Sequence, residues 1–276
     1  MLKQRVITAL LLIQLVIWDI LNFSSPTLAW LLAAFVVLAA WEWAGICGWQ
    51  QLIWRNSYAI VMGLTLFMSY GSWHNYPKVG KFLLITACLW WSIAFYWVLN
   101  YQRSQDRLPT SSLIKALLGF FILLPAWAAL LILHEHDHYG KHWVVFLLVL
   151  IWAADSGAYF IGKRWGKIKL ADKVSPGKTW EGVIGALLMS FLVSASYALL
   201  NAMSLMTVLF FMLLCSITVM ASILGDLLES AFKRQMGIKD SSQILPGHGG
   251  ILDRIDSLTA AAPIFVMGLI LLGNRL

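Results

Sequence analysis

Two pairs of acidic side chains, each with a spacing of three residues, are the part of this sequence best suited to chemistry. Asp226 precedes Glu229, and Asp253 precedes Asp256. A spacing of three places both members of a pair on one face of a helix. Neighbouring carboxylates repel each other unless a cation lies between them, and oxygen ligands that leave room for phosphate favour Mg²⁺ or Mn²⁺. The acids therefore indicate a divalent-cation site, the alternative being that Asp253 pairs with Arg254 as ordinary interfacial charge.

Basic side chains follow the first acidic pair closely. Within ten positions of Glu229 the chain has Lys233, Arg234 and Lys239. Cations beside a carboxylate-bound metal suit a polyphosphate, whose charge they neutralise. The same residues would also fit a solvated helix face or a cluster that meets lipid headgroups. Further on, His248 lies in the turn PGHGG, whose glycines let backbone amides approach a ligand. We interpret His248 as a phosphate contact or a proton carrier.

The segment SPGKT resembles the end of a nucleotide-binding P-loop, but the complete motif is absent. It requires a glycine where this chain has Asp172, and a preceding β-strand that a membrane helix cannot supply. What remains is a turn in which Ser175, Lys178 and Thr179 offer donors ahead of a helix N-terminus, a place that favours anions. Upstream, Asp155 lies within an apolar segment, and we expect it to point into the protein toward the same site.

The elements that must position these residues are predicted to be membrane helices. Of the 276 residues 60% are apolar and 12% are charged, and the mean hydropathy is +0.77. Soluble domains of this length do not have such a composition. Crossing a bilayer takes about 20 apolar residues in a helix, because backbone amides in lipid must satisfy one another. We therefore predict an all-α integral membrane protein with about nine transmembrane helices, at 6–23, 27–46, 57–73, 81–100, 113–133, 143–161, 182–202, 204–225 and 256–273.

The charges of the loops predict the orientation of these helices. With the N-terminus in the cytoplasm, sixteen of the twenty Lys and Arg residues fall on the cytoplasmic side, as the positive-inside tendency requires. The net charge of +7 is thus a signal of topology, and we expect no nucleic-acid partner. The seventh and eighth helices form a hairpin, which brings the charged stretches 155–182 and 230–257 to the same cytoplasmic face. We expect a polar catalytic pocket there.

The two halves of the chain differ in what they reveal. Residues 1–142 are predicted to form a hydrophobic multi-helix membrane region, and 143–276 a catalytic membrane region with two charged cytoplasmic loops, both within one integral unit. In the first half, Asp19 and Glu42 are candidates for function as acids inside apolar helices, but we favour their interpretation as structural acids near helix ends. The cluster HEHDH at 134–138 could bind zinc, but its predicted outer position, across the membrane from the other acids, argues against a functional metal site.

The run SAFKRQMGIKDSSQILPGHGGILDRID, at 230–256, closely resembles the signature of the phosphatidate cytidylyltransferases, the CDP-diacylglycerol synthases. DSGAYFIGKRWGK and SPGKTWEG resemble that family's other recurrent segments, in the same order. The resemblance covers the second half of the chain strongly, whereas the first 142 residues match only as a hydrophobic region with several spans. It implies transfer of a cytidylyl group from CTP to phosphatidic acid in phospholipid biosynthesis, giving CDP-diacylglycerol and pyrophosphate.

The resemblance also implies roles for individual residues. A catalytic Mg²⁺, with a second cation such as K⁺ as an option, would be held by Asp226, Asp253 and Asp256. The implied phosphate contacts are Lys233, Arg234 and His248. The set expected to bind the substrates comprises Asp155, Ser175, Lys178, Thr179, Lys239 and Arg254. The partners expected are CTP, phosphatidic acid and membrane lipids, with a homodimer as an option. The expected location is a bacterial plasma (inner) membrane, with the active site facing the cytoplasm.

Two alternatives stay open at this point. A secondary transporter would also bury acids in its spans, but it should have interrupted helices near the midplane, whereas the polar residues here gather at one face. Another lipid-phosphate transferase, such as a CDP-alcohol phosphotransferase, would share the metal chemistry. Its DGxxAR pattern is absent from this chain.

Overall fold

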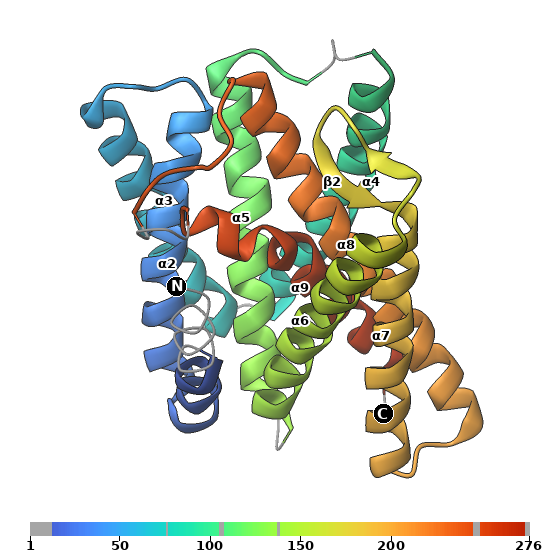
Figure 1. The fold of residues 1–276 in the computed structure, drawn as a ribbon. Helices are drawn as coiled ribbons and strands as arrows, with labels where there is room; N and C mark the ends of the chain where they lie inside the picture. Colours follow the sequence, from blue (N-terminus) through green and yellow to red (C-terminus); the bar gives the residue numbers. More distant parts are fainter. Residues whose placement is uncertain (1–12, 76, 105–107, 137–138, 245–248, 274–276) are drawn as a thin grey trace.

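A bundle of α-helices with one small β-hairpin makes up the computed structural model, which describes residues 13–75, 77–104, 108–136, 139–244 and 249–273 (Figure 1). Within these ranges the elements are a first helix at Ile13–Asn22, α2 (Ser25–Ile46), α3 (Leu52–Asn75), α4 (Pro77–Ser104), α5 (Ser112–Glu135), α6 (Gly140–Trp165), β1 (Lys169–Ala171), β2 (Ser175–Thr179), α7 (Trp180–Leu200), α8 (Leu205–Gln235) and α9 (Leu252–Leu272). Nine helices are thus present in the described ranges, as predicted, but only part of the prediction that all nine cross a membrane is confirmed.

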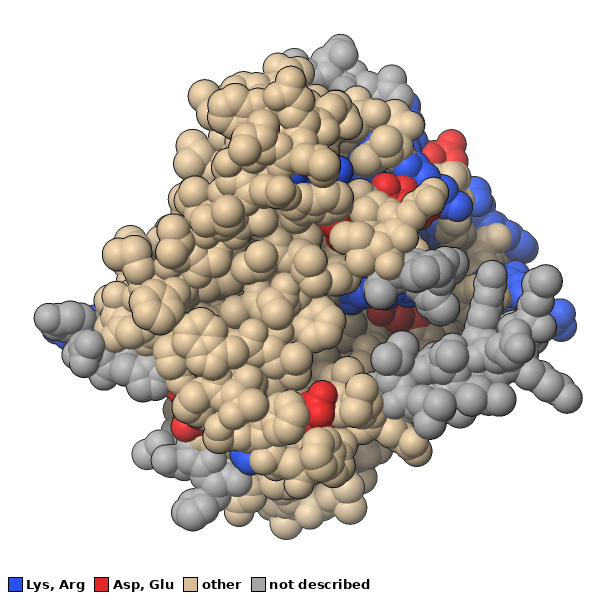
Figure 2. Space-filling view, turned by 90° about the vertical axis from the view of Figure 1, so that its left-hand side faces the viewer, with Lys and Arg blue, Asp and Glu red and all other residues tan. Residues whose placement is uncertain are grey.

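Seven of the described helices, α2 and α4 to α9, are long and apolar enough to cross a membrane. The first helix is shorter in its described part, and α3 carries several polar residues, so neither meets the same criterion. Large apolar side chains cover the outside of the bundle; Leu199 is 81% exposed and Leu200 is 85% exposed. On the face drawn in Figure 2 most of the surface carries no charged residue, and Lys and Arg gather toward one edge. Such a surface suits lipid contact.

The helix α8 is longer than predicted, because it ends at Gln235 and not near residue 225. Its 31 residues span about 46 Å at 1.5 Å per residue, more than the roughly 30 Å of a bilayer core. The prediction ended the helix where apolar residues give way to charges. Nothing in that stretch breaks a helix before Gly237, which has a φ of +69°. The extension places Asp226, Glu229 and Lys233 on one continuous helix.

A β-hairpin replaces the turn predicted at SPGKT, and that prediction was wrong. Strands β1 and β2 are antiparallel, with Lys169 opposite Thr179. Lys169 Nζ donates to the backbone oxygen of Pro176 at 2.6 Å. Thr179 ends β2 and begins α7, where its Oγ1 accepts from the backbone N–H of Gly182 at 3.1 Å. The hairpin therefore enters α7 through an ordinary side-chain cap.

Glycines let two helix pairs approach until their backbones touch. A Cβ on Gly157 of α6 would lie 2.6 Å from the backbone oxygen of Gly185 on α7, and a Cβ on Gly185 would lie 2.5 Å from that of Gly157. On α8 a Cβ at Gly225 would lie 2.5 Å from the backbone oxygen of Asp256 on α9. Such close packing of small residues is typical of membrane helices. The second crossing brings α8 and α9 together where both carry acids.

The first half of the chain packs directly against the second. Helix α9 contacts α2, α4 and α5, and α8 contacts α4. Phe232 of α8 meets Trp43 of α2 edge to face, with ring centroids 5.3 Å apart. The division at residue 142 stays a prediction, and these contacts join the two regions into one bundle.

Candidate active site

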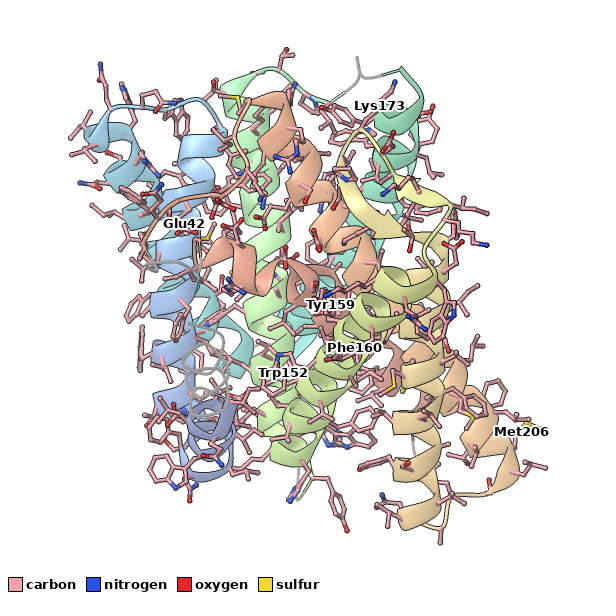
Figure 3. All side chains as sticks on the ribbon, viewed as in Figure 1. Glu42, Trp152, Tyr159, Phe160, Lys173 and Met206 are labelled. Atoms are coloured by element: carbon pink, nitrogen blue, oxygen red, sulfur yellow. The ribbon has the colours of Figure 1, made fainter. Side chains whose placement is uncertain are left out.

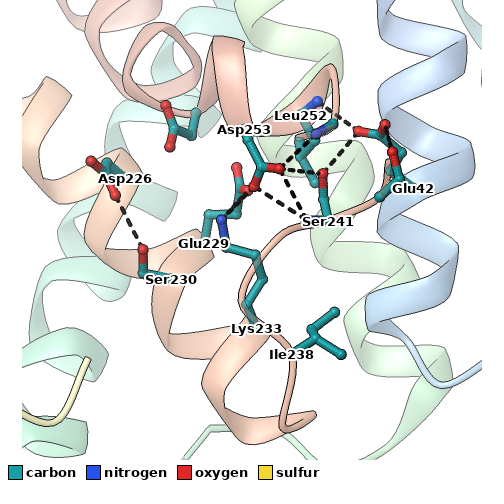
Figure 4. Close-up of polar contacts among 12 residues, drawn as sticks. Glu42, Asp226, Glu229, Ser230, Lys233, Ile238, Ser241, Leu252 and Asp253 are labelled. Carbon is teal, nitrogen blue, oxygen red and sulfur yellow. Dashed lines mark hydrogen bonds and ion pairs between the residues drawn. The ribbon is translucent and has the colours of Figure 1, made fainter. Parts of the chain in front are cut away.

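A buried lysine on α8 lies between two acids, one on its own helix and one on α9. Lys233 Nζ is 3.0 Å from Glu229 Oε1 and 2.5 Å from Asp253 Oδ1 (Figure 4). The side chain of Lys233 is 8% exposed and that of Glu229 is 5% exposed. Glu229 precedes Lys233 by four residues, which places both on one helix face. The pair of contacts therefore fixes the ammonium group in a largely water-free position.

Asp253 receives several further donors from the segment that precedes α9. Its Oδ2 accepts from the backbone N–H of Gly250 at 2.8 Å and of Ser241 at 3.0 Å, and from Ser241 Oγ at 3.0 Å. Gly249 next to it has a φ of +82°, in the left-handed region that favours glycine. Gly249 and Gly250, of the PGHGG segment, thus allow a backbone amide to reach the carboxylate of Asp253.

Asp226 and Asp256 form a second acidic group beside the first. Lys178 Nζ, at the end of β2, is 2.6 Å from Asp226 Oδ2, and Ser230 Oγ donates to Asp226 Oδ1 at 3.1 Å. Asp256 lies within electrostatic range of Asp226, as the close crossing at Gly225 requires. The hairpin, α8 and the start of α9 therefore meet, and the hydrogen bond from Arg234 to Val174 brings the two charged stretches together.

Asp155 approaches the same group from α6. Asp155 is exposed, which differs from the expectation that it points into the protein, but it lies within electrostatic range of both Lys178 and Asp226. Its role in the site stays a prediction. The acids of α6, α8 and α9 are thereby gathered around the lysine of the hairpin.

The charges of this cluster do not balance. Five carboxylates (Asp155, Asp226, Glu229, Asp253 and Asp256) stand against two ammonium groups (Lys178 and Lys233), which leaves three negative charges uncompensated among these seven side chains when all are ionised. Hard oxygen donors with excess negative charge fit Mg²⁺, which commonly binds one or two carboxylates together with substrate phosphates. The donor set thus suits the cation that the sequence predicts.

The three predicted metal ligands share one region but not one coordination sphere. Within the described ranges, no three His, Cys, Asp or Glu side chains are grouped so that they could hold one metal ion. Lys178 contacts Asp226, whereas Lys233 contacts Asp253. Each lysine occupies a place beside a carboxylate that a cation could also take. Joint binding by Asp226, Asp253 and Asp256 stays a prediction.

The remaining predicted site residues differ in their surroundings, and two of them, Arg234 and Thr179, make structural contacts. Arg234 donates through Nε to the backbone oxygen of Val174 at 3.1 Å and through Nη1 to that of Ile238 at 3.0 Å, so it braces the hairpin against the end of α8. Thr179 is buried as the cap of α7. Ser175 is half-buried, whereas Lys239 and Arg254 are exposed. His248 lies outside the described residues.

The HEHDH segment has a structural contact at its first residue. His134 is buried, and its ring nitrogens are 2.8 Å from Ser25 Oγ and 3.0 Å from the backbone oxygen of Ile20. Asp137 and His138 lie outside the described residues. The contacts of His134 join α5 to the start of α2.

Comparison with known proteins decides the family. Residues 3–272 match the model of the cytidylyltransferase family. The phosphatidate cytidylyltransferase of Haemophilus influenzae is 41% identical over 280 residues, which cover 96% of this chain and 97% of that relative. The chain belongs to the phosphatidate cytidylyltransferase family. The phosphatidate cytidylyltransferase of Pseudomonas aeruginosa is 42% identical over 265 residues, 96% of each chain. That of Bacillus subtilis is 42% identical over 127 residues, 46% of this chain and 47% of the relative.

For a phosphatidate cytidylyltransferase, the most informative contact that the sequence did not predict is made by Glu42. This acid of α2 is fully buried and accepts hydrogen bonds from the segment between α8 and α9. The two serines of that segment, Ser241 and Ser242, were likewise not assigned a role. An acid inside an apolar helix was the available signal, but the sequence could not show which distant segment supplies its partners.

An apolar cavity of about 620 Å³ opens between α2 and α3, apart from the acidic cluster. It is lined by Val37, Leu38, Trp41, Asn56, Ala59, Ile60, Gly63 and Ile244. Since no carboxylate lines it, this cavity contributes nothing to the charged chemistry described above.

Proposed function

We propose that this membrane enzyme transfers the cytidylyl group of CTP to phosphatidate at the acidic and basic cluster formed by β2, α8 and α9. Its family establishes the reaction, in which CTP and phosphatidate give CDP-diacylglycerol. The observation that supports the place of reaction is the meeting of Lys178 and Lys233 with the acids of α8 and α9. Membership of this family also argues against the transporter and the CDP-alcohol phosphotransferase.

The reaction makes modest demands on the residues. An oxygen of the phosphatidate phosphate forms a bond to the α-phosphorus of CTP, the bond from that phosphorus to the bridging oxygen breaks, and pyrophosphate leaves. The attacking oxygen is already anionic, so no strong general base is required. The main obstacle is the repulsion between two polyanions. Positioning and charge neutralisation are therefore the expected sources of the rate.

Lys178 and Lys233 are the groups that we assign to the phosphates. Lys178, on the hairpin, contacts Asp226, and Lys233, on α8, contacts Asp253. Each ammonium group is carried by a flexible side chain that can turn toward a phosphate oxygen. His248, Lys239 and Arg254 complete the proposed substrate contacts, along with Ser175 and Asp155. Thr179, which was predicted from the sequence as one of these contacts, acts in this proposal as the cap of α7. In this proposal Arg234 acts by holding the hairpin against α8.

Asp226, Asp253 and Asp256 would hold Mg²⁺, which when bound would neutralise the triphosphate and help the pyrophosphate to leave. The excess of carboxylates over ammonium groups supports this assignment, and it leaves room for a second cation such as K⁺. The acids themselves keep Lys178 and Lys233 in place until phosphates compete for them.

The site faces the cytoplasm in this proposal. Lys173, in the turn of the hairpin, and Met206, at the start of α8, lie toward opposite ends of the bundle (Figure 3). The basic hairpin thus marks one end, and the positive-inside tendency assigns that end to the cytoplasm, where CTP is available. A bacterial plasma membrane and a homodimer belong to the same proposal.

The position of the label in CTP tests the reaction. Purified protein in detergent micelles with phosphatidate and Mg²⁺ is given CTP labelled with ³²P at either the α or the γ phosphate. We expect the α label in the lipid phase and the γ label in pyrophosphate. Entry of the γ label into lipid, or of neither label from monodisperse protein, would contradict cytidylyl transfer.

A further inference from the structure

We propose that Glu42, on α2, is a positioning residue for cytidylyl transfer, because its carboxylate binds Ser241, Ser242 and the first residues of α9, and these contacts hold Asp253 in the site. The inference rests on the proposed function. It assigns a role in the reaction to a residue of the first half of the chain, which was predicted from the sequence only as a hydrophobic membrane region.

The carboxylate of Glu42 is 0% exposed and both of its oxygens are fully used. Oε1 accepts from Ser242 Oγ at 2.5 Å and from the backbone N–H of Ile251 at 3.0 Å. Oε2 accepts from the backbone N–H of Leu252 at 2.7 Å and from Ser241 Oγ at 3.1 Å. A buried carboxylate is very costly unless donors surround it. These four donors show that the pocket around Glu42 is built for a negative charge.

Two of these donors are backbone amides at the start of α9. The first N–H groups of a helix have no partner within the helix, and the helix dipole favours a negative charge beside them. Ile251 occupies the N-cap position of α9, and its apolar side chain cannot accept a hydrogen bond from these amides. Glu42 therefore caps α9 from a different helix and sets where α9 begins. Asp253 lies in the first turn of α9, directly after Leu252.

Ser241 forms a second route from Glu42 to Asp253. Its Oγ is 3.1 Å from Glu42 Oε2 and 3.0 Å from Asp253 Oδ2, and its backbone N–H donates to Asp253 Oδ2 at 3.0 Å (Figure 4). The packing is tight, since a Cβ on Gly250 would lie 2.0 Å from Ser241 Oγ and 2.6 Å from Glu42 Oε2. Asp253 in turn contacts Lys233. A continuous chain of polar contacts thus runs from Glu42 to a phosphate-binding lysine.

Substitution Glu42→Gln tests the role with little change in shape. The amide NH₂ group replaces one oxygen and cannot accept from the backbone N–H of Ile251 or Leu252. A shift of the reacting groups by about 1 Å can cost roughly 100-fold in rate. We expect kcat to fall roughly 10- to 100-fold, while KM for CTP stays near its wild-type value. Hydrogen exchange at the amides of Ile251 and Leu252 should become faster, and exchange in α5 should not change.

A matched pair of serine variants guards against misfolding of Glu42→Gln. Ser242→Ala removes one donor to Glu42, whereas Ser194→Ala removes a buried hydroxyl of α7 that donates to the backbone oxygen of Ser190, far from Glu42 in the sequence. We expect Ser242→Ala to lower kcat and to speed exchange at Leu252, and Ser194→Ala to alter neither.

Two results would overturn the proposal: wild-type kcat and exchange in Glu42→Gln, or faster exchange throughout α2 and α5 with kcat falling only in proportion to the folded fraction. The second result would reduce Glu42 to a stabiliser of the fold. If the wild-type protein transferred no cytidylyl label, the proposed function would fail, but the exchange measurement would still show whether Glu42 holds the segment.

Discussion

Replacing Lys233 by methionine should destabilise the folded protein strongly, because it leaves the buried Glu229 and the half-buried Asp253 without their shared cation. The side chain of Lys233 is 8% exposed, and it contacts both Glu229 and Asp253. Asp253 keeps its donors from Gly250 and Ser241 after the substitution. Glu229 Oε1 has no hydrogen bond besides this ion pair within the described structure. The loss therefore falls mainly on Glu229.

The magnitude follows from what Glu229 can do without a cation. Breaking a buried ion pair by removing one partner costs about 3–5 kcal/mol. Protonation limits the loss, since protonating a glutamate with an unperturbed pKa of about 4.3 costs about 3.7 kcal/mol at pH 7. A Lys233→Met/Glu229→Gln double variant carries no such charge, so its deficit should be below about 2 kcal/mol.

Thermal unfolding in detergent, followed by tryptophan fluorescence, measures these differences. Because protonation limits the loss to about 3.7 kcal/mol, a loss of about 3–3.7 kcal/mol corresponds, for a chain of this size, to a Tm lowered by about 6–15 °C. The double variant should recover most of that shift. Lys239→Met is the control, because Lys239 is exposed in the same region and its loss should change stability by less than about 0.5 kcal/mol. A wild-type Tm for Lys233→Met, or no recovery in the double variant, would refute the reasoning.

Three further predictions address the glycines, the helix cap and the cation. Gly250→Ala should lower kcat more than tenfold and stability by about 1–3 kcal/mol, because the added Cβ would collide with Ser241 Oγ. The control Gly177→Ala should leave kcat and Tm unchanged, because a Cβ there has no neighbouring atom within 4 Å. Thr179→Ala should cost about 1 kcal/mol in thermal unfolding and Thr179→Ser much less, with KM for CTP constant in both; a raised KM at constant Tm would make Thr179 a substrate contact. Chelation by EDTA should abolish label transfer and added Mg²⁺ should restore it, so a persistent rate would argue against the cation.

The sequence predicted the parts of this fold that depend on local pattern. Apolar runs located nine helices, of which seven described ones are long and apolar enough to cross a membrane, where each helix must satisfy its own backbone. The charged stretches were correctly expected to converge, as the hydrogen bond from Arg234 to the backbone oxygen of Val174 shows. The end of α8 was missed because hydropathy falls at Asp226, although the helix continues to Gln235 on residues that tolerate it. The strand β2 was missed because its five residues, SPGKT, were interpreted as a turn.

The details of the site depend on contacts that no local pattern contains. Glu42 and Leu252 are 210 positions apart, so their hydrogen bond could not be inferred from spacing. Lys178 and Lys233 were predicted to contact substrate phosphates. Which acid each lysine contacts depends on how α8 crosses α9 at Gly225, and the sequence does not contain that information. Side-chain chemistry could be predicted from residue type, and the pairing required the fold.

The rate of cytidylyl transfer by Asp226→Asn tests the central claim, that the acids of α8 and α9 carry the reaction. Wild-type protein, Asp226→Asn and the control Asp172→Asn, which alters an exposed acid of the hairpin turn, are compared at equal folded concentration. The assay follows α-³²P-labelled CTP into phosphatidate with Mg²⁺ present. We predict a loss of about 100-fold or more for Asp226→Asn and a wild-type rate for Asp172→Asn. A wild-type rate for Asp226→Asn would contradict the account.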